Sequence, residues 1–360
     1  MKLLWFSWRD LKHPEAGGAE VLAHHVMRRL TKKGYDLTLF CAKFANCLVT
    51  ECIDGVTIIR DGGKYTVYNK ARRYYNLNGD KYDLIIDEIN AKPFLTPKFV
   101  NNRPILALFH QLNAQYWFYE TFFPLNYIGY YYLESKWLSH YRNIPTITVS
   151  NSSKKDLELL GFKKIFLIPV GLDITPLSNL CKKEQNPTLV FIGRLTKAKL
   201  PHHALDAFRI IKRTIPNAVL WIIGDGYLRK NLEKFNEKDV VFYGRVKNDL
   251  KYELLSRAHL VLLPGIREGW GLVVTESNAM GTPVIAYDIP GFRDSVLNGE
   301  TGILIDENSP KGLAQSAVTL LQDPQLLRHY SLKSLAFSKQ FNWNNTANEF
   351  DNIIRSLLAQ

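Results

Sequence analysis

Apolar residues along the chain alternate between short runs typical of buried strands and longer stretches with the spacing of amphipathic helices. We predict strands at residues 3–7, 36–41, 84–87, 105–110 and 146–150, and then at 188–192, 219–224, 240–243, 260–263 and 283–287. The clearest helix is predicted over 19–33, where the apolar positions share one face before Gly34. Strands that alternate with helices in this way indicate an α/β protein with parallel sheets.

The length of the chain and the interruptions of this pattern indicate two domains. A chain of 360 residues with 46% hydrophobic content is too long for one compact core. Residues 169–173 and the polar run 178–187 are typical of a hinge. We predict a domain over 1–170, a second domain over 171–340, and an amphipathic helix over 341–360 that packs back on the first domain.

Composition argues against several classes of protein. The longest apolar runs fall far short of the roughly 20 residues that cross a bilayer, and the N-terminal stretch lacks a signal-peptide cleavage site. We therefore expect a cytoplasmic protein. The four cysteines form no CxxC pair, which argues against a structural zinc site and against a disulfide framework. The net charge of +12 suits nucleic acids, anionic membranes or phosphorylated molecules. No nucleic-acid-binding motif accompanies it, so nucleic acid is not an expected partner.

Two clusters have the composition of phosphate sites. Gly17 and Gly18 lie between the first predicted strand and helix, where backbone amides can approach an anion. Their spacing is not GxGxxG, so tight packing is the alternative explanation. Gly193 and Arg194 follow the strand at 188–192, and Lys199 comes five residues after Arg194. An arginine fork and a lysine charge can neutralise a diphosphate without a metal, although a solvated basic loop has the same composition.

A third cluster combines carboxylates with a glycine-rich helix start. Glu268 lies in a loop and Glu276 about one turn inside the predicted helix, so both can converge on one ligand with the amides of Gly271 and Leu272. Carboxylates accept hydrogen bonds from sugar and ribose hydroxyls, whereas amides suit a phosphate. A glycosidase with paired carboxylates is the rival interpretation. It is weakened because hydrolysis needs no phosphate-binding features.

Together these clusters resemble the retaining glycosyltransferases of family four, which have the GT-B fold of two facing Rossmann-like domains with a cleft between them. The family pattern of Glu, seven residues, Glu corresponds to Glu268 and Glu276. Its Gly-Arg-Leu turn with a later lysine corresponds to Arg194 and Lys199. Weaker similarities lie at 17–20, 149–154, 222–226 and 299–304, and the resemblance covers nearly the whole chain.

The resemblance implies a first domain that binds the acceptor, a second that binds a nucleotide sugar, and a role for each site residue. Arg194 and Lys199 would hold the donor diphosphate, Glu276 the ribose and Glu268 a hydroxyl of the transferred sugar. His110 would approach the anomeric carbon, although a lone histidine at a strand end is more often structural. The implied catalytic residues are His110, Arg194, Lys199 and Glu268, and the implied donor-binding residues are Gly17, Gly18, Gly193, Gly244, Arg245, Val246, Trp270, Gly271, Leu272 and Glu276.

The family also implies how the reaction proceeds. Retention without an evident enzymic nucleophile implies attack on the same face of the sugar, with the departing phosphate accepting the acceptor proton. The chain has no DxD motif, so neither a metal nor another cofactor is expected. Leu200 and Gly265 stand where the family usually has Gly and Ser, and Trp270 stands where Phe is usual.

The expected donor is a UDP-sugar, UDP-glucose first, ahead of UDP-galactose, UDP-N-acetylglucosamine and GDP-mannose. The expected acceptor is a saccharide or a polyprenyl-linked lipid, in exopolysaccharide or glycan biosynthesis. The aromatic segment 115–141 follows a basic stretch. It would either dock on the inner face of a membrane or supply core and sugar-stacking residues, and both interpretations remain open. A sugar-nucleotide epimerase of the same fold and a binding protein without turnover are the alternative functions.

Overall fold

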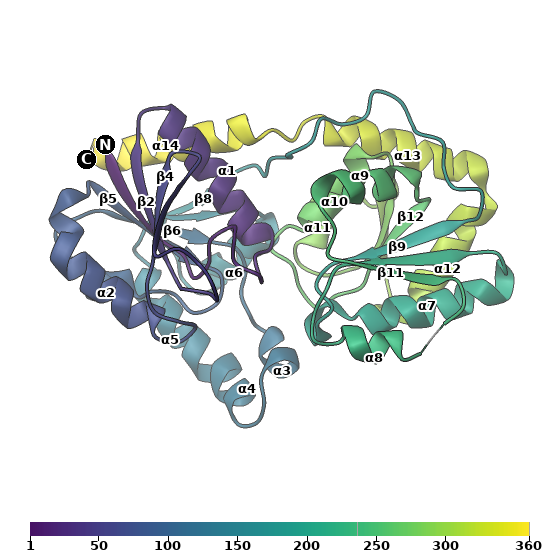
Figure 1. Ribbon diagram of the computed structural model, residues 1–360, viewed down its shortest axis with the longest axis horizontal. Coiled ribbons are helices and arrows are strands. Elements are labelled where there is room, and N and C mark those ends of the chain that lie inside the picture. The colour runs from purple at the N-terminus through teal and green to yellow at the C-terminus, as the bar shows by residue number, and fades with distance from the viewer. Residues whose placement is uncertain (236, 360) are drawn as a thin grey trace. The chain divides into compact units, whose positions relative to one another are not determined.

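The computed structural model describes residues 1–235 and 237–359. Residue 236 of the predicted second domain and residue 360 of the predicted C-terminal segment lie outside the described residues. The chain forms two compact units (Figure 1). Unit 1 contains Met1–Ala114, Phe123–Gly171 and Asn342–Gln360, and unit 2 contains Gln115–Phe122 and Leu172–Phe341. The segment 115–122, which the sequence places in the first domain, therefore makes its contacts with unit 2.

The described part of unit 1 is built on an eight-stranded sheet in the order β3-β4-β2-β1-β5-β6-β7-β8, parallel except for the antiparallel pair of β3 and β4. Its strands are β1 (Lys2–Phe6), β2 (Asp36–Cys41), β3 (Thr50–Ile53), β4 (Val56–Arg60), β5 (Leu84–Ile89), β6 (Ile105–Phe109), β7 (Thr146–Thr148) and β8 (Ile165–Leu167). Its α-helices are α1 (Gly18–Lys32), α2 (Val67–Asn78), α4 (Leu125–Ile128), α5 (Glu134–Leu138), α6 (Asn151–Leu159) and α14 (Trp343–Leu358). Every residue of β5 and β6 is buried, as expected for strands covered by helices on both faces.

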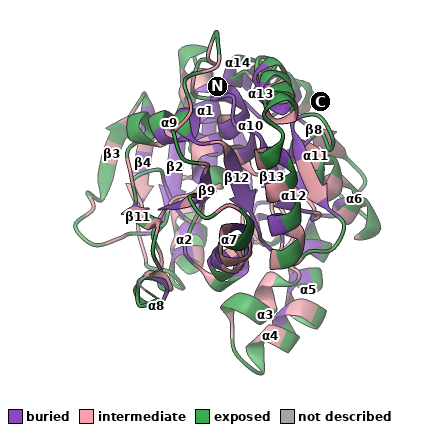
Figure 2. Cartoon of the chain, turned by 90° about the vertical axis from the view of Figure 1, so that its right-hand side faces the viewer, coloured by how far each residue is buried: buried purple, intermediate pink, exposed green. Residues whose placement is uncertain are grey.

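The described part of unit 2 contains a six-stranded, wholly parallel sheet in the order β11-β10-β9-β12-β13-β14. Its strands are β9 (Thr188–Ile192), β10 (Val219–Ile223), β11 (Val240–Gly244), β12 (Leu260–Leu263), β13 (Val284–Tyr287) and β14 (Gly302–Ile305). Its α-helices are α3 (Tyr116–Glu120), α7 (Pro201–Thr214), α8 (Arg229–Glu233), α9 (Asn248–Arg257), α10 (Leu272–Ala279), α11 (Phe292–Ser295), α12 (Pro310–Gln322) and α13 (Pro324–Ser338). Figure 2 shows that the buried residues of this unit are concentrated in strands such as β9, β12 and β13.

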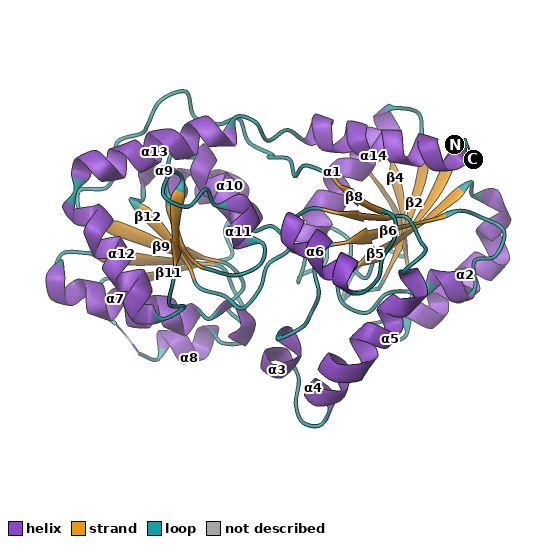
Figure 3. Ribbon diagram, turned by 180° about the vertical axis from the view of Figure 1, so that it is seen from behind, coloured by secondary structure: helices purple, strands orange, loops and turns teal. Residues whose placement is uncertain are grey.

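The C-terminal helix α14 returns to unit 1 and packs along α1, as predicted; Figure 3 shows these two helices on one side of the sheet and α2 and α5 on the other. The ring of Trp5 in β1 stacks on Phe350 with centroids 5.4 Å apart. His25 of α1 stacks on Trp343 at 4.8 Å. Trp5 and Phe350 are fully buried, so α14 forms part of the core of unit 1.

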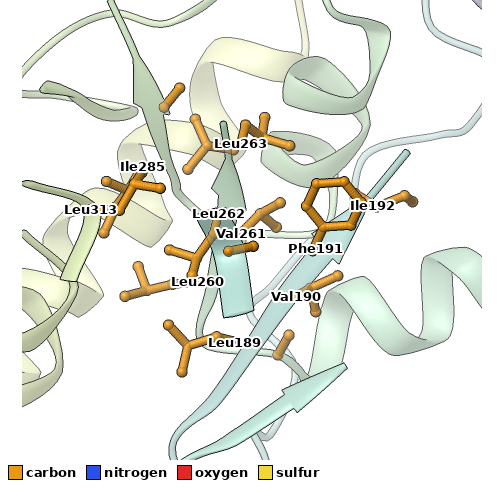
Figure 4. Packing of buried hydrophobic residues seen from close by; sticks show 14 of the residues in the cluster. Leu189, Val190, Phe191, Ile192, Leu260, Val261, Leu262, Leu263, Ile285 and Leu313 are labelled. Atoms are coloured by element: carbon orange, nitrogen blue, oxygen red, sulfur yellow. The ribbon is translucent and has the colours of Figure 1, made fainter. Parts of the chain in front are cut away.

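The core of unit 2 is formed by β9, β12 and β13 and by the helices that cover them. Figure 4 shows the side chains of 189–192 and 260–263 packed with Ile285 and Leu313. Because buried parallel strands need apolar residues on both faces, these strands read as continuous hydrophobic runs in the sequence. The structure confirms the predicted α/β class with two parallel-sheet, Rossmann-like units. Among the described residues, no helix has both the length and the apolar content that crossing a bilayer requires.

Candidate active site

The loops that follow β9, β10 and β11 are joined backbone to backbone at the carboxyl edge of the unit 2 sheet. The amide of Gly193 donates to the carbonyl of Ile223 (3.0 Å), and the amide of Gly224 donates to the carbonyl of Gly244 (2.8 Å). A Cβ atom at Gly224 would lie 1.9 Å from the carbonyl oxygen of Gly193, so only glycine permits this approach. Two of the predicted donor-binding glycines, Gly193 and Gly244, thus hold the loop that begins with Arg194 against its neighbours.

Arg194 and Lys199 differ sharply in their surroundings. The guanidinium of Arg194 is exposed, and within the described residues it makes no hydrogen bond or ion pair. Lys199 lies in the short 3₁₀ turn η5 (Lys197–Lys199), and its ammonium forms an ion pair with the carboxylate of Glu268. The side chains of Lys199 and Glu268 are 16% and 22% exposed, so this pair is largely withdrawn from water.

The charge of Lys199 is secured by its neighbours. Burial alone would lower the pKa of Lys199, but the carboxylate of Glu268 and the nearby Tyr116 outweigh it, and the net shift is upward. The charges of Lys199 and Glu268 offset each other, whereas the exposed guanidinium of Arg194 is paired with no carboxylate among the described residues. An exposed guanidinium of this kind suits an anionic ligand.

The loop from Glu268 to the start of α10 is fixed by glycines with left-handed backbone angles. The amide of Glu268 donates to the carbonyl of Pro290 (3.1 Å). Gly291 has φ 88°, and a Cβ there would lie 2.3 Å from the carbonyl oxygen of Glu268. Gly271, with φ 87°, is the N-cap of α10. The first amides of a helix have no partner inside it, so the α10 N-terminus, where the candidates Gly271 and Leu272 lie, offers donors for an anion or a hydroxyl oxygen.

Glu276 lies on α10 and is held by a residue that sequence reasoning missed. The ammonium of Lys251 on α9 donates to Oε1 of Glu276 at 2.7 Å, and both side chains are largely buried. Burial and the neighbouring Glu276 raise the pKa of Tyr252, whose hydroxyl lies 3.5 Å from the same oxygen. The two carboxylates of the Glu-x₇-Glu pattern are thus each paired with a lysine.

The remaining candidate residues of unit 2 lie in loops. The ring of Trp270 packs edge-on against Phe341 with centroids 5.8 Å apart, so this side chain is held by a contact within unit 2. Val246 is half-buried against the core, and Arg245 is exposed directly after Gly244. Leu200 has φ 50°, the left-handed conformation that explains the preference of the family for glycine at this position.

In unit 1, His110 is oriented by a buried carboxylate. It follows β6, and its Nε2 lies 2.9 Å from Oε1 of Glu88. The other oxygen of Glu88 accepts a hydrogen bond from the indole of Trp5 at 2.7 Å. In the neutral imidazole, a hydrogen bond donated by Nε2 to this carboxylate oxygen leaves Nδ1 as the acceptor. The sequence offers no motif that would have identified Glu88.

The glycines at the start of α1 are already capped. Gly17 is the N-cap of α1, which begins at Gly18, and the amide of Gly17 donates to Oε2 of Glu20 at 2.6 Å. The other oxygen of this buried Glu20 side chain accepts from Nε of Arg9 at 2.9 Å. The Gly17 amide is therefore engaged by a carboxylate of the chain itself.

The aromatic segment 115–141 divides into two parts. Tyr141 is fully buried, and its hydroxyl donates to the carboxylate of Asp87, so the end of the segment is core. Phe122, Phe123 and Tyr131 are 71%, 74% and 70% exposed and do not belong to the core. The structure thus brings Arg194, Lys199, Glu268 and Glu276 into unit 2, and Gly17, Gly18 and His110 into unit 1. Within the described residues, no group of three or more His, Cys, Asp or Glu could hold a metal ion.

Comparison with known proteins gives matches over both units. The family described as Glycosyltransferase Family 4 matches residues 16–175, and Glycosyl transferases group 1 matches residues 178–334. The glycogen synthase of Mycobacterium tuberculosis is 30% identical over 212 residues, which cover 56% of this chain and 51% of that protein. The chain thus spans about half the length of the curated relatives it matches.

Two solved structures share the fold over nearly their whole length. The sucrose-phosphate synthase of Thermosynechococcus elongatus superposes with a TM-score of 0.81 at 19% identity, over 99% of both chains. Anabaena HepE in complex with UDP-glucose gives a TM-score of 0.77 at 19% identity, over 99% of this chain and 100% of that one. Two Rossmann-like units of this kind define a GT-B protein. The chain belongs to the group 1 glycosyltransferases of family 4, which confirms the resemblance read from its motifs.

Proposed function

We propose that the protein transfers a hexose from a UDP-sugar, UDP-glucose first, to a hydroxyl of a saccharide or a lipid-linked acceptor. The observation that carries the proposal is the exposed guanidinium of Arg194, which has no ion-pair partner among the described residues and lies at the carboxyl end of β9 in the loop of the largely buried Lys199–Glu268 pair. A nucleoside diphosphate carries negative charges that Arg194 and Lys199 can neutralise. The similarity to Anabaena HepE, solved with UDP-glucose, supports this donor class.

The reaction breaks the bond between the anomeric carbon and the diphosphate oxygen and forms a bond from that carbon to the acceptor oxygen. Arg194 and Lys199 stabilise the negative charge that develops on the departing diphosphate, which is the largest contribution a protein can make to such a step. The departing phosphate takes the acceptor proton, and attack from the same face retains configuration. The role proposed for His110 rests on the family resemblance, in which this histidine approaches the anomeric carbon of the donor sugar.

Two cations in this role replace the divalent metal that other sugar transferases place on the diphosphate. Turnover should therefore persist after dialysis against EDTA. Loss of turnover on chelation, with recovery on adding Mg²⁺ or Mn²⁺, would show that this part of the proposal is wrong.

Incubation with UDP-sugar labelled in the hexose tests the activity against its rivals. A transferase moves the label to an acceptor and releases UDP. An epimerase converts the labelled donor into its epimer without an acceptor, and a binding protein leaves the donor unchanged. A thermal-shift screen of UDP-glucose, UDP-galactose, UDP-N-acetylglucosamine and GDP-mannose identifies the donor, because a ligand that binds only the folded state raises its stability. The proposal fails if none of the four shifts the transition.

A lipid-linked acceptor fits an exposed aromatic stripe in unit 1. Phe123, Tyr127 and Tyr131 follow one another at helical spacing with centroids 6.1 and 6.2 Å apart, and all three are more than half exposed. The ammonium of Lys136 donates to the hydroxyl of Tyr132 (2.9 Å) beside the stripe. Aromatic rings next to a cation are typical of a membrane interface. Flotation with anionic liposomes should recover the protein, and the Phe123→Ser/Tyr131→Ser variant should remain behind; equal flotation of both would contradict this role.

A further inference from the structure

The chain leaves unit 1 at residue 115 and re-enters it at residue 123. The segment in between, 115–122, makes its contacts within unit 2. Just before it, the amides of Asn113 and Ala114 donate to the two carboxylate oxygens of Glu134 in α5, at 2.5 and 2.9 Å. Glu134 is buried, so the chain is anchored in unit 1 immediately before the segment begins. The segment itself forms the helix α3.

Glu120, the last residue of α3, binds the turn that presents Lys199. Its Oε1 accepts the backbone amide of Ala198 at 2.9 Å, and its Oε2 accepts the hydroxyl of Tyr227 at 2.9 Å. The Tyr227 oxygen in turn accepts the amide of Lys197 at 2.8 Å. One carboxylate therefore holds two consecutive amides of the η5 turn, one of them directly and the other through Tyr227.

Tyr116, the first residue of α3, binds the loop that presents Glu268. Its hydroxyl donates to the carbonyl of Arg267 at 3.0 Å. The two loops also meet directly, because the amide of Ile266 donates to the carbonyl of Ala198 at 3.1 Å. The helix α3 thus spans the two loops that carry the two partners of the Lys199–Glu268 ion pair.

The η5 turn needs this external support. Its C-cap is Leu200 with φ 50°, a left-handed conformation that strains a non-glycine residue. A turn with such strain persists only when surrounding contacts fix it. The hydrogen bonds from α3 and Tyr227 supply contacts of that kind on the amide side of the turn.

We propose that Glu120 is a positioning residue of the donor site, which fixes the η5 turn so that the Lys199 ammonium is held ready for the donor diphosphate. The inference rests on the proposed function of Arg194 and Lys199. By this proposal α3, a short helix from the first half of the sequence, supports the turn of unit 2 that carries Lys199.

The test compares Glu120→Ala, Glu120→Gln and Tyr227→Phe with Glu253→Ala as the matched control. Glu253 has an exposed carboxylate in unit 2. Its Oε1 accepts a hydrogen bond from Nη1 of Arg257, 2.7 Å away. Loss of a charge-assisted hydrogen bond predicts a roughly 10-fold weaker UDP affinity in calorimetry for Glu120→Ala, and a similar fall in kcat. Glu120→Gln keeps one acceptor oxygen and should recover part of both. The double variant Glu120→Ala/Tyr227→Phe should be no worse than Glu120→Ala, because both act on one hydrogen-bond chain.

The outcomes separate this inference from the proposed function. If Arg194→Ala loses UDP binding while Glu120→Ala binds UDP and turns over like Glu253→Ala, positioning by Glu120 is overturned and the donor site stands. If Glu120→Ala lowers the unfolding temperature without changing UDP affinity or kcat, Glu120 is structural only and the inference is again overturned. If Arg194→Ala binds UDP normally, the proposed function itself fails.

Discussion

Nζ of Lys251 lies 2.7 Å from Oε1 of Glu276, so a residue outside every recognised motif holds the carboxylate assigned to the donor ribose. The two side chains are 16% and 15% exposed. A carboxylate that has lost most of its hydration is stabilised by an opposite charge. Lys251 therefore holds Glu276 in place with a counter-charge.

Replacing Lys251 by methionine should weaken UDP binding by about 10-fold, because the largely buried carboxylate of Glu276 loses the counter-charge that holds it in place. Titration calorimetry with UDP measures the change. Lys311→Met, at an exposed position on α12, is the control. If both variants bind UDP equally well, the ion pair has no part in nucleotide binding.

Arg194→Ala and Lys199→Ala should each lower turnover by at least about 100-fold, because each removes charge stabilisation of the departing diphosphate. The two variants should differ in stability, since only Lys199→Ala leaves a largely buried partner, Glu268, without its counter-charge. Rates with labelled donor and thermal unfolding of both variants measure the effects. Near-normal turnover in Arg194→Ala would remove the basis of the proposed function.

Glu88→Gln should reduce turnover while leaving UDP affinity unchanged. A glutamine can accept only one of the two hydrogen bonds that Glu88 receives from Trp5 and His110. If the side-chain NH₂ group of the glutamine faces His110, Nε2 of His110 must accept the hydrogen bond. The imidazole proton then moves to Nδ1. Imidazole ¹⁵N chemical shifts report the tautomer. An unchanged tautomer together with a wild-type rate would show that Glu88 does not orient His110 for catalysis.

Gly291→Ala should destabilise the protein by more than Gly299→Ala. Both glycines have left-handed backbone angles, φ 88° and φ 83°, which cost an alanine about 1–2 kcal/mol. At Gly299 a Cβ would meet nothing within 4 Å, whereas at Gly291 it would overlap the carbonyl of Glu268 at 2.3 Å. Denaturant unfolding measures the difference. Equal destabilisation of the two variants would mean that the loop around Glu268 moves to accommodate the added Cβ atom at no cost in stability.

The contact of His25 with Trp343 should make unit 1 sensitive to acid. Burial lowers the pKa of His25 to about 3, assisted by the charges of Arg28 and Arg29 and opposed by Asp54. The unfolded chain, with a histidine pKa near 6.5, therefore binds more protons between pH 6.5 and pH 3, and the free energy of unfolding falls as the pH falls through this window. His25→Phe keeps a ring against Trp343 and removes the titration, so its stability should fall less steeply. If the free energy of unfolding falls equally with pH in both proteins, the titration of His25 does not cause the acid sensitivity.

The fold could be predicted because buried parallel strands leave apolar runs that are visible in the sequence. The runs at 188–192 and 260–263 coincide with β9 and β12. The prediction missed the hairpin of β3 and β4, although its Asp54-Gly55 turn, with φ 51° and φ 83°, is a recognisable signal. It also missed β8 and β14, which are short and only partly buried.

The candidate site could be predicted only where its residues are consecutive or regularly spaced. Arg194, Lys199, Glu268 and Glu276 belong to such patterns. Lys251, Glu88 and Glu120 act on residues that are 25, 22 and 78 positions away, so chain folding alone brings them to their partners. No local signal distinguishes them from other exposed or buried charges.

The return of α14 to unit 1 has a consequence for biosynthesis. Trp5 and Phe350 lie buried against each other, yet the ribosome makes Trp5 long before it makes Phe350. Every segment of unit 2 has been made once residue 341 emerges, while unit 1 must wait for α14. The nascent chain therefore carries an uncovered aromatic surface until α14 has been made, and unit 1, whose strands are translated first, completes its core after unit 2.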